Sequence, residues 1–305
     1  MNIKGRHFLT LLDYKTEELK EIIDLAIDMK SGKIVKNLPN KTLGMLFQKP
    51  STRTRISFEV GMTQLGGHAI YLDFRTTQLG RGETISDTSK VLSRYCDILM
   101  ARLYKQTDLV ELANASSIPV INALTDLYHP CQTMADMMTV IEKRGKIKGL
   151  KVAFLGDCGF NMCNSTIIGF SKLGADVVAV CPDKDVYTPN PEILNAAKKQ
   201  AAGNITVEHD PIRGVMNADI IYTDTWVSMG QEDAEQRIKD LRPYQVNEKL
   251  VSHASKDVLV MHCLPAHRGQ EITDDVIDGP HSIVFDEAEN RLHVQKAIMV
   301  SLMGV

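Results

Sequence analysis

Short apolar runs alternate with amphipathic helical patterns along almost the whole chain, and this alternation constrains the fold more than any other feature. Three clear apolar runs are KVAFLGD at 151–157, ADIIYTD at 218–224 and VLVMHCLP at 258–265. Strands that are apolar throughout are typical of parallel sheets covered by helices on both faces, and right-handed crossovers connect such strands. We therefore predict an α/β protein with two doubly wound domains, each with a mostly parallel sheet flanked by helices.

The chain length and one polar stretch predict where the domains divide. The chain has 305 residues, which corresponds to two domains because a domain averages about 150 residues. The polar segment 145–149 separates two series of alternating elements, so we expect a first domain at 1–145 and a second at 150–290. A strand is expected at 282–287 (SIVFDE), and a terminal helix at 291–305 is expected to pack back on the first domain.

The composition and the cysteine pattern favour a soluble, cytoplasmic protein. The formal net charge is only −3, which gives no indication of a nucleic-acid or membrane partner. The 6 cysteines form no CxxC pair, so we expect reduced thiols in a reducing compartment. The first residues lack the apolar stretch of a signal peptide, and no segment approaches the roughly 20 apolar residues of a membrane span.

The segment Lys49–Arg55 (KPSTRTR) lies between a predicted strand and a predicted helix. Ser51 is a suitable N-cap, and the N–H groups that follow it have no partner within the helix. These donors and the positive end of the helix dipole favour a tetrahedral anion, and Arg53 and Arg55 add forked donors suited to phosphate. A capped helix with solvated arginines is an equally good interpretation of this segment alone.

A second polar motif, His129-Pro130-Cys131-Gln132, precedes another predicted helix. Histidine can donate to a carbonyl oxygen, and glutamine offers both a donor and an acceptor, so the pair suits a carbamoyl group. Taken alone, His129 is more simply interpreted as a cap or core histidine. Cys131 is not expected to be a nucleophile, because adjacency to a histidine in sequence does not make a catalytic dyad.

Three further polar loops follow predicted strands, where ligands bind in parallel sheets. The loop 156–165 (GDCGFNMCNS) lacks the GxGxxG pattern of a dinucleotide site, so its asparagines favour a small ligand. In the loop 224–230, Asp224 offers a carboxylate for a cationic amine and Ser228 a hydroxyl. In the loop 262–269, Cys263 could contact the same amine. The HCxxxH spacing fits no common zinc site, so no metal is expected.

In this order the motifs resemble the aspartate/ornithine carbamoyltransferase family, whose marker is Ser-Thr-Arg-Thr-Arg before a Ser-Phe-Glu helix, present here at 51–59. The resemblance extends over essentially the whole chain. Two motifs favour the branch of the family that uses ornithine. One is the loop 224–230 (DTWVSMG), and the other is Cys263-Leu264, where the aspartate enzymes typically carry Pro-Leu.

The resemblance implies a role for each matched residue. Carbamoyl phosphate would be bound by Ser51, Thr52, Arg53, Thr54, Gln78, Arg102, His129, Gln132, Cys263, Leu264 and Arg291. Ornithine would be bound by Asn161, Asp224, Ser228 and Met229, and the catalytic residues would be Arg102, His129, Asp224 and Cys263. Family members often carry two adjacent asparagines in the loop before residue 162, whereas Phe160 precedes Asn161 here, so the ornithine contact could also fall to Asn164.

The resemblance also implies an assembly and a reaction. The expected partners are the small-molecule substrates and further copies of the chain, in a homotrimer whose active sites are shared between subunits. Gln78 would then act in a neighbouring subunit's site. The expected reaction gives citrulline and phosphate and needs no metal or organic cofactor. The alternatives are a carbamoyltransferase that uses aspartate or putrescine, an NAD-dependent oxidoreductase, and a non-catalytic phosphate-binding protein.

Overall fold

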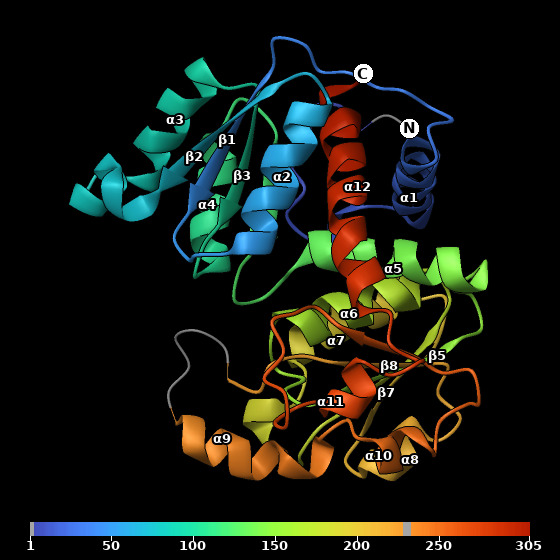
Figure 1. The fold of residues 1–305 in the computed structure, drawn as a ribbon. Helices are drawn as coiled ribbons and strands as arrows, with labels where there is room; N and C mark the ends of the chain where they lie inside the picture. The colour runs from blue at the N-terminus through green and yellow to red at the C-terminus, as the bar shows by residue number, and fades with distance from the viewer. Residues whose placement is uncertain (1–2, 228–232) are drawn as a thin grey trace. The chain divides into compact units, whose positions relative to one another are not determined.

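Two parallel sheets organise the chain, and the computed structural model describes residues 3–227 and 233–305 (Figure 1). The chain divides into a first unit, Met1–Met138 with Glu289–Val305, and a second unit, Thr139–Ala288. Each unit holds one sheet with helices on its faces, which confirms the predicted fold class. Within the described ranges, no helix is both long and apolar enough to span a bilayer.

The first unit contains a four-stranded parallel sheet with the strand order β2-β1-β3-β4. Its strands are β1 (Thr42–Phe47), β2 (His68–Asp73), β3 (Ile98–Arg102) and β4 (Val120–Leu124). Helix α2 (Thr52–Gln64) lies on one face, and α3 (Ile85–Tyr95) and α4 (Gln106–Ala115) lie on the other (Figure 1). Crossovers therefore leave β1 and β3, which are neighbours, toward opposite faces.

The second unit contains a five-stranded parallel sheet with the order β7-β6-β5-β8-β9. Its strands are β5 (Lys151–Leu155), β6 (Asp176–Val180), β7 (Ile205–Glu208), β8 (Ile220–Thr223) and β9 (Leu259–His262). Helices α6 (Asn161–Lys172) and α7 (Pro191–Gln200) lie on one face, while α8 (Pro211–Val215) and α10 (Glu248–Val251) lie on the other (Figure 1). Here the crossovers change face between the neighbours β5 and β8.

The prediction of a strand at 282–287 is wrong, because helix α12 (Val284–Met303) begins there. Only Ser282 pairs with the sheet, through one isolated bridge to Val260. Asp286 and Glu287 occupy the first turn of α12, where carboxylates complement the helix dipole. Glu287 is buried and accepts hydrogen bonds from the Tyr222 hydroxyl (3.0 Å) and the His262 N–H (3.2 Å), so contacts with β8 and β9 fix the first turn of this helix.

The later part of α12 packs in the first unit, between α1 (Thr16–Lys30) and α2 (Figure 1). Gln295 donates to the Ser57 hydroxyl of α2 at 2.7 Å, and Lys30 of α1 donates to Asn290 at 2.8 Å. The apolar side of this part is buried at Val294, Ala297 and Ile298. The end of the chain therefore lies against the helix whose N-terminus carries the first predicted motif.

The predicted polar loop after β8 also contains regular structure. Helix α9 (Ala234–Leu241) and helix α10 lie between β8 and β9, and a further short helix, α11 (Asp274–Ile277), follows β9. These helices were not predicted because they are short, and α9 buries only Arg237 and Leu241. Such segments show little of the apolar periodicity from which a helix is recognised.

Candidate active site

Helix α2 begins with the cap that the sequence predicts. Ser51 is the N-cap residue, with an extended backbone, and its side chain accepts from the Thr54 N–H at 3.3 Å. Thr52 is exposed, and Arg53 is half-buried. The N–H groups of this first turn point out of the helix, and with the helix dipole they favour a negatively charged group.

The hydroxyl of Thr54 joins two of the predicted arginines. It accepts from Arg102 (Nη1 to Oγ1, 3.4 Å), at the end of β3, and from Arg291 (Nη2 to Oγ1, 3.2 Å), on α12. Three segments far apart in the sequence thus meet at the start of α2. Because β1 and β3 are paired as parallel strands, with Phe47 opposite Arg102, the carboxyl end of β3 lies next to the loop after β1.

Neutral side chains orient Arg291, which is only 2% exposed. Its Nη1 donates to Oε1 of Gln132 at 2.7 Å, and its Nε donates to Oε1 of Gln295 at 2.9 Å. The amide of Gln132 in turn donates to Asp136 at 2.9 Å. Gln132 therefore presents a fixed orientation, with its carbonyl toward the arginine.

His129 lies in the same cluster and is held in its neutral form. Its pKa lies well below the usual 6.5, first because the ring is buried and then because Arg291, Arg102 and Arg53 place positive charge around it. Lys49 is also buried, with its ammonium 4.4 Å from the Tyr104 ring centroid. The positive charges that keep this imidazole neutral also favour an anionic ligand. A neutral imidazole can still donate one hydrogen bond.

Two further residues that the sequence analysis considered behave differently from this cluster. Gln78 is exposed at the start of the 3₁₀ turn Gln78–Arg81, and within the described chain its side chain makes no hydrogen bond to the cluster. Cys131 is fully buried, its thiol donates to the Asn122 carbonyl at 3.3 Å, and burial raises its pKa to about 12. A thiol in that state is a poor nucleophile, in agreement with the sequence interpretation.

In the second unit, the predicted acid and thiol are in direct contact. The Cys263 thiol donates to Oδ1 of Asp224 at 3.0 Å, and the same oxygen accepts from the Thr225 N–H at 2.7 Å. Asp224 directly follows β8, and Cys263 directly follows β9. Thr223 and His262, the last residues of these strands, are paired in register, so the next residue of each strand must emerge beside the other.

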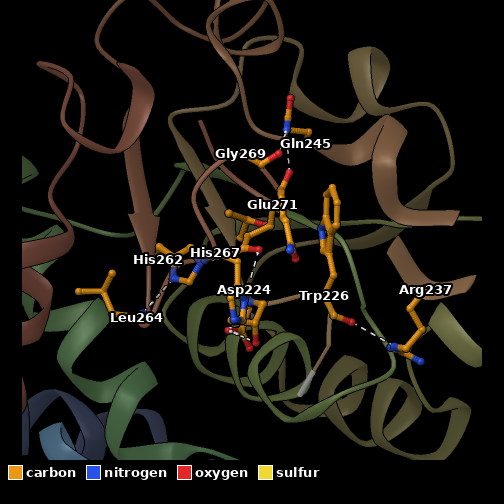
Figure 2. A network of polar contacts seen from close by, with 12 residues as sticks. Asp224, Trp226, Arg237, Gln245, His262, Leu264, His267, Gly269 and Glu271 are labelled. Carbon is orange, nitrogen blue, oxygen red and sulfur yellow. Dashed lines mark hydrogen bonds and ion pairs between the residues drawn. The ribbon is translucent and has the colours of Figure 1, made fainter. Parts of the chain in front are cut away.

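A buried histidine supports the backbone on which Cys263 lies (Figure 2). His262 is fully buried, and its Nδ1 accepts from the Leu264 N–H at 2.9 Å, so Nε2 donates to Glu271 at 3.1 Å. Leu264 has a positive φ of 55°, which is strained for a branched residue. The bond to His262 therefore stabilises an unfavourable backbone conformation next to the thiol.

Possible ligand atoms of Asp224, His262 and Cys263 lie within 4.8 Å of one another. Both ring nitrogens of His262 are engaged, however, by Leu264 and Glu271. A common zinc site needs at least three protein ligands. In the part of the chain that the structure describes, this group therefore suits a hydrogen-bonding role better than metal coordination.

The remaining predicted residues of the second unit follow β5, follow β9 or lie outside the described ranges. Asn161 is buried at the first position of α6, and Asn164 is buried one turn later. Leu264 is half-buried after Cys263. Ser228 and Met229 lie outside the described residues.

Comparisons with known proteins agree with this arrangement. The carbamoyl-P binding domain of aspartate/ornithine carbamoyltransferase matches residues 6–142, and the Asp/Orn binding domain matches residues 148–302. The chain belongs to the aspartate/ornithine carbamoyltransferase family. It is 54% identical to an ornithine carbamoyltransferase of Pyrococcus horikoshii, over 100% of this chain and 98% of that protein.

Solved structures of the family have the same fold. An ornithine carbamoyltransferase from Pyrococcus furiosus superposes with a TM-score of 0.94 at 53% identity, covering 100% of this chain and 99% of that one. One from Gloeobacter violaceus gives a TM-score of 0.91 at 41% identity and covers 100% of both chains. The two-unit α/β architecture is thus that of the family.

Sequence reasoning missed the residues that orient the predicted ones. Gln295 follows Arg291 by four positions and Asp136 follows Gln132 by four, each on one helix, and each pair is hydrogen-bonded. Residues four apart face each other on a helix, so this spacing was a usable signal. Ser57, which accepts from Gln295, carried no comparable signal.

The neutral state of His129 predicts a pH dependence of stability. Below pH 6.5 the unfolded chain binds a proton at this residue and the folded chain does not. The free energy of unfolding should therefore decrease as the pH is lowered. One such group contributes a slope of up to about 1.4 kcal/mol per pH unit. Denaturant unfolding between pH 5 and 7.5 should show a shallower slope for His129→Gln. The exposed His68 provides the control His68→Gln, and equal slopes for His129→Gln and wild type would contradict this account.

Proposed function

We propose that this enzyme transfers the carbamoyl group of carbamoyl phosphate to the side-chain amine of L-ornithine, giving L-citrulline and phosphate. The observation that carries the proposal is the end-to-end match with proteins named ornithine carbamoyltransferase. The chemistry of the two units supports it. The first unit offers an arginine-rich helix N-terminus for an anion, and the second offers a carboxylate and a thiol for an amine.

The first unit supplies the carbamoyl-phosphate half of the reaction. The helix N-terminus at 51–54 and Arg53 hold the phosphate, while Arg102, His129 and Gln132 face the carbamoyl group. Arg291 shares the hydroxyl of Thr54 with Arg102, so the two guanidiniums converge on one region. In keeping with the match of the carbamoyl-P binding domain at 6–142, we assign this half to residues 1–145 together with the helix 291–305.

The second unit supplies the acceptor half, which we assign to residues 150–290. Asp224 and Asn161 bind ornithine together with Ser228 and Met229, and Cys263 with Leu264 lines the reaction centre. The side-chain ammonium of ornithine must lose a proton before it attacks, because such amines titrate near about 10. The Asp224 carboxylate and the Cys263 thiol bind this amine and orient its nitrogen for the attack.

The transfer then follows from these positions. The neutral amine nitrogen forms a bond to the carbamoyl carbon, and the bond from that carbon to the phosphate oxygen breaks. Negative charge that develops on the carbamoyl oxygen is stabilised by Arg102, His129 and the Thr54 hydroxyl, a contribution often worth several kcal/mol. The nitrogen loses its proton, and phosphate leaves against the positive charge at the start of α2.

An acceptor assay tests the reaction. With carbamoyl phosphate and ornithine, the purified enzyme should form citrulline, measured by colorimetry or mass spectrometry. Aspartate and putrescine should be carbamoylated far more slowly. Aspartate has a carboxylate where ornithine has its side-chain amine, and putrescine lacks the α-carboxylate by which ornithine would be bound. If either compound were carbamoylated faster than ornithine, that compound would be the acceptor and the assignment of ornithine would be wrong.

Variants of the two halves should affect the two substrates separately. Arg53→Ala should raise the KM for carbamoyl phosphate and lower kcat by at least about 100-fold, the usual cost of a lost transition-state contact. Asp224→Asn should act mainly on the ornithine dependence, since it removes the charge that faces the amine. Steady-state kinetics with each substrate varied in turn distinguishes the two patterns. Near-normal kinetics of either variant would remove the role assigned to that residue.

We also propose that the enzyme forms a homotrimer whose active sites are shared between subunits. Helix α2 exposes Ile56 (54%) and Val60 (38%) beside a surface hollow of about 610 Å³, and exposed apolar surface of this kind favours association. Gln78, which is exposed in its own chain, would reach the site of a neighbouring subunit.

Ile56→Glu should disrupt this assembly, because it places a charge on the apolar surface of α2. Light scattering coupled to size exclusion should give the mass of three chains for wild type and a lower mass for the variant. Val35 is 77% exposed and is not part of α2, so Val35→Glu provides the control. A wild-type monomer, or an intact trimer of Ile56→Glu, would contradict the proposed interface.

A cytoplasmic location and a role in arginine biosynthesis complete the proposal. All six cysteines are free thiols, and five of them are buried, which suits a reducing compartment. The related Pyrococcus furiosus protein is named an anabolic ornithine carbamoyltransferase.

A further inference from the structure

We propose that Arg237 and Asp157 form a positioning pair that holds two loops of the acceptor half in the geometry that the reaction needs. The inference rests on the proposed function and extends it. Neither residue belongs to the set that the family resemblance implies, and neither is expected to touch a substrate. Their role is to fix the loops that follow β5 and β8.

Arg237 binds three separate segments of the second unit. It lies on α9, and its Nε donates to the Trp226 carbonyl at 3.0 Å, as Figure 2 shows. A terminal guanidinium nitrogen donates to Oδ2 of Asp157. The guanidinium also lies over the Tyr187 ring, 5.0 Å from its centroid. One side chain thus connects the loop after β8, the loop after β5 and the turn Asp185–Tyr187.

Asp157 controls the turn that leads to Asn161. It is the second residue after β5, and its Oδ1 accepts from the Gly159 N–H at 3.0 Å while Oδ2 accepts from Arg237. Asn161 is the first residue of α6, two positions beyond Gly159. A displacement of the Asp157 carboxylate would therefore move the start of α6 and the asparagine that we assign to ornithine.

Trp226 connects the same pair to Asp224, two residues earlier. Its indole is fully buried against Gly156, where an added Cβ would lie 3.4 Å from Cδ1 of the tryptophan. Gly156 also has a φ of +119°, which only glycine adopts without strain. The loops after β5 and β8 are thus in contact, and Arg237 binds the backbone of one and the carboxylate of the other.

A purely stabilising ion pair is the competing explanation. Both side chains are only 8% exposed, and desolvation offsets much of the attraction in such pairs, so burial alone is weak evidence for stability. The geometry favours positioning, because Arg237 uses its forked donors on two different acceptors at once. A lysine could not reproduce both bonds in this fixed arrangement.

Kinetics of Arg237 variants test the inference. Arg237→Gln should raise the KM for ornithine at least about tenfold, since a displacement of about 1 Å can cost up to 100-fold, while the KM for carbamoyl phosphate stays within twofold. Arg237→Lys, which keeps the charge but lacks the planar fork of donors, should recover part of the loss. Arg213, an exposed arginine of the same unit that pairs with Glu208, provides the control Arg213→Gln, with wild-type kinetics expected. An unchanged ornithine KM in folded Arg237→Gln overturns the proposal.

The double variant Arg237→Gln/Asp157→Asn separates positioning from stability. Each single variant leaves one buried partner uncompensated and should lower the Tm. The double variant removes both charges, so its Tm should recover relative to the single variants, whereas the ornithine KM should stay raised. Recovery of the KM together with the Tm would mean that the pair only stabilises the fold, and would overturn the proposal.

Amide hydrogen exchange tests the pair independently of the reaction. If the wild-type enzyme formed no citrulline, the proposed function would be wrong. Hydrogen exchange would still show whether Arg237 and Asp157 hold the two loops in place. Exchange in residues 156–160 and 224–227 should be faster in Arg237→Gln than in wild type or Arg213→Gln. Equal exchange in all three proteins would show that Arg237 does not fix these loops.

Discussion

Parallel pairing of neighbouring strands determines where the chemistry of this chain lies. In the first unit, β1 and β3 are neighbours whose crossovers leave toward opposite faces of the sheet, and in the second unit β5 and β8 are related in the same way. Ligands of open parallel sheets bind at such switch points, beyond the carboxyl ends of the strands. The start of α2 and Arg102 lie at the first switch point, and Asn161 and Asp224 lie at the second. Both groups thus follow from one topological rule applied twice.

The two units use this common position for opposite electrostatic tasks. Around Thr54 the first unit gathers permanently charged guanidiniums, and burial of the ring, together with their field, keeps the pKa of His129 low and the ring neutral. The side-chain carbonyls of Gln132 and Gln295 accept from Arg291 and so orient its guanidinium. The second unit presents the Asp224 carboxylate and the Cys263 thiol instead. In the proposed reaction, the fixed positive charge of the first unit suits a phosphate leaving group, and the carboxylate and thiol of the second unit suit an amine.

Much of this could be predicted because the decisive signals are local. The apolar runs, the Ser51 cap and the placement of polar loops after strands each depend on a few consecutive residues, and the structure reproduces all of them. The contact of Asp224 with Cys263 also follows once the strands that precede them are taken as parallel neighbours. The segment 282–287 was wrongly predicted as a strand because its apolar residues suit either structure, and the buried contacts of Glu287 that favour the helix come from distant β8 and β9.

The residues that hold the site in place could be predicted only in part, for a physical reason. Partners four apart on one helix, such as Arg291 and Gln295, are fixed by helix geometry and can be recognised from spacing. Arg237 and Asp157 are 80 residues apart in sequence, and their meeting depends on how α9 packs beside the exits of β5 and β8. Nothing near Arg237 distinguishes it from a solvated helix arginine. The loops that carry the chemistry are short and polar, with little apolar surface to fix them, so their positions depend on long-range contacts of this kind, which become visible only in the folded chain.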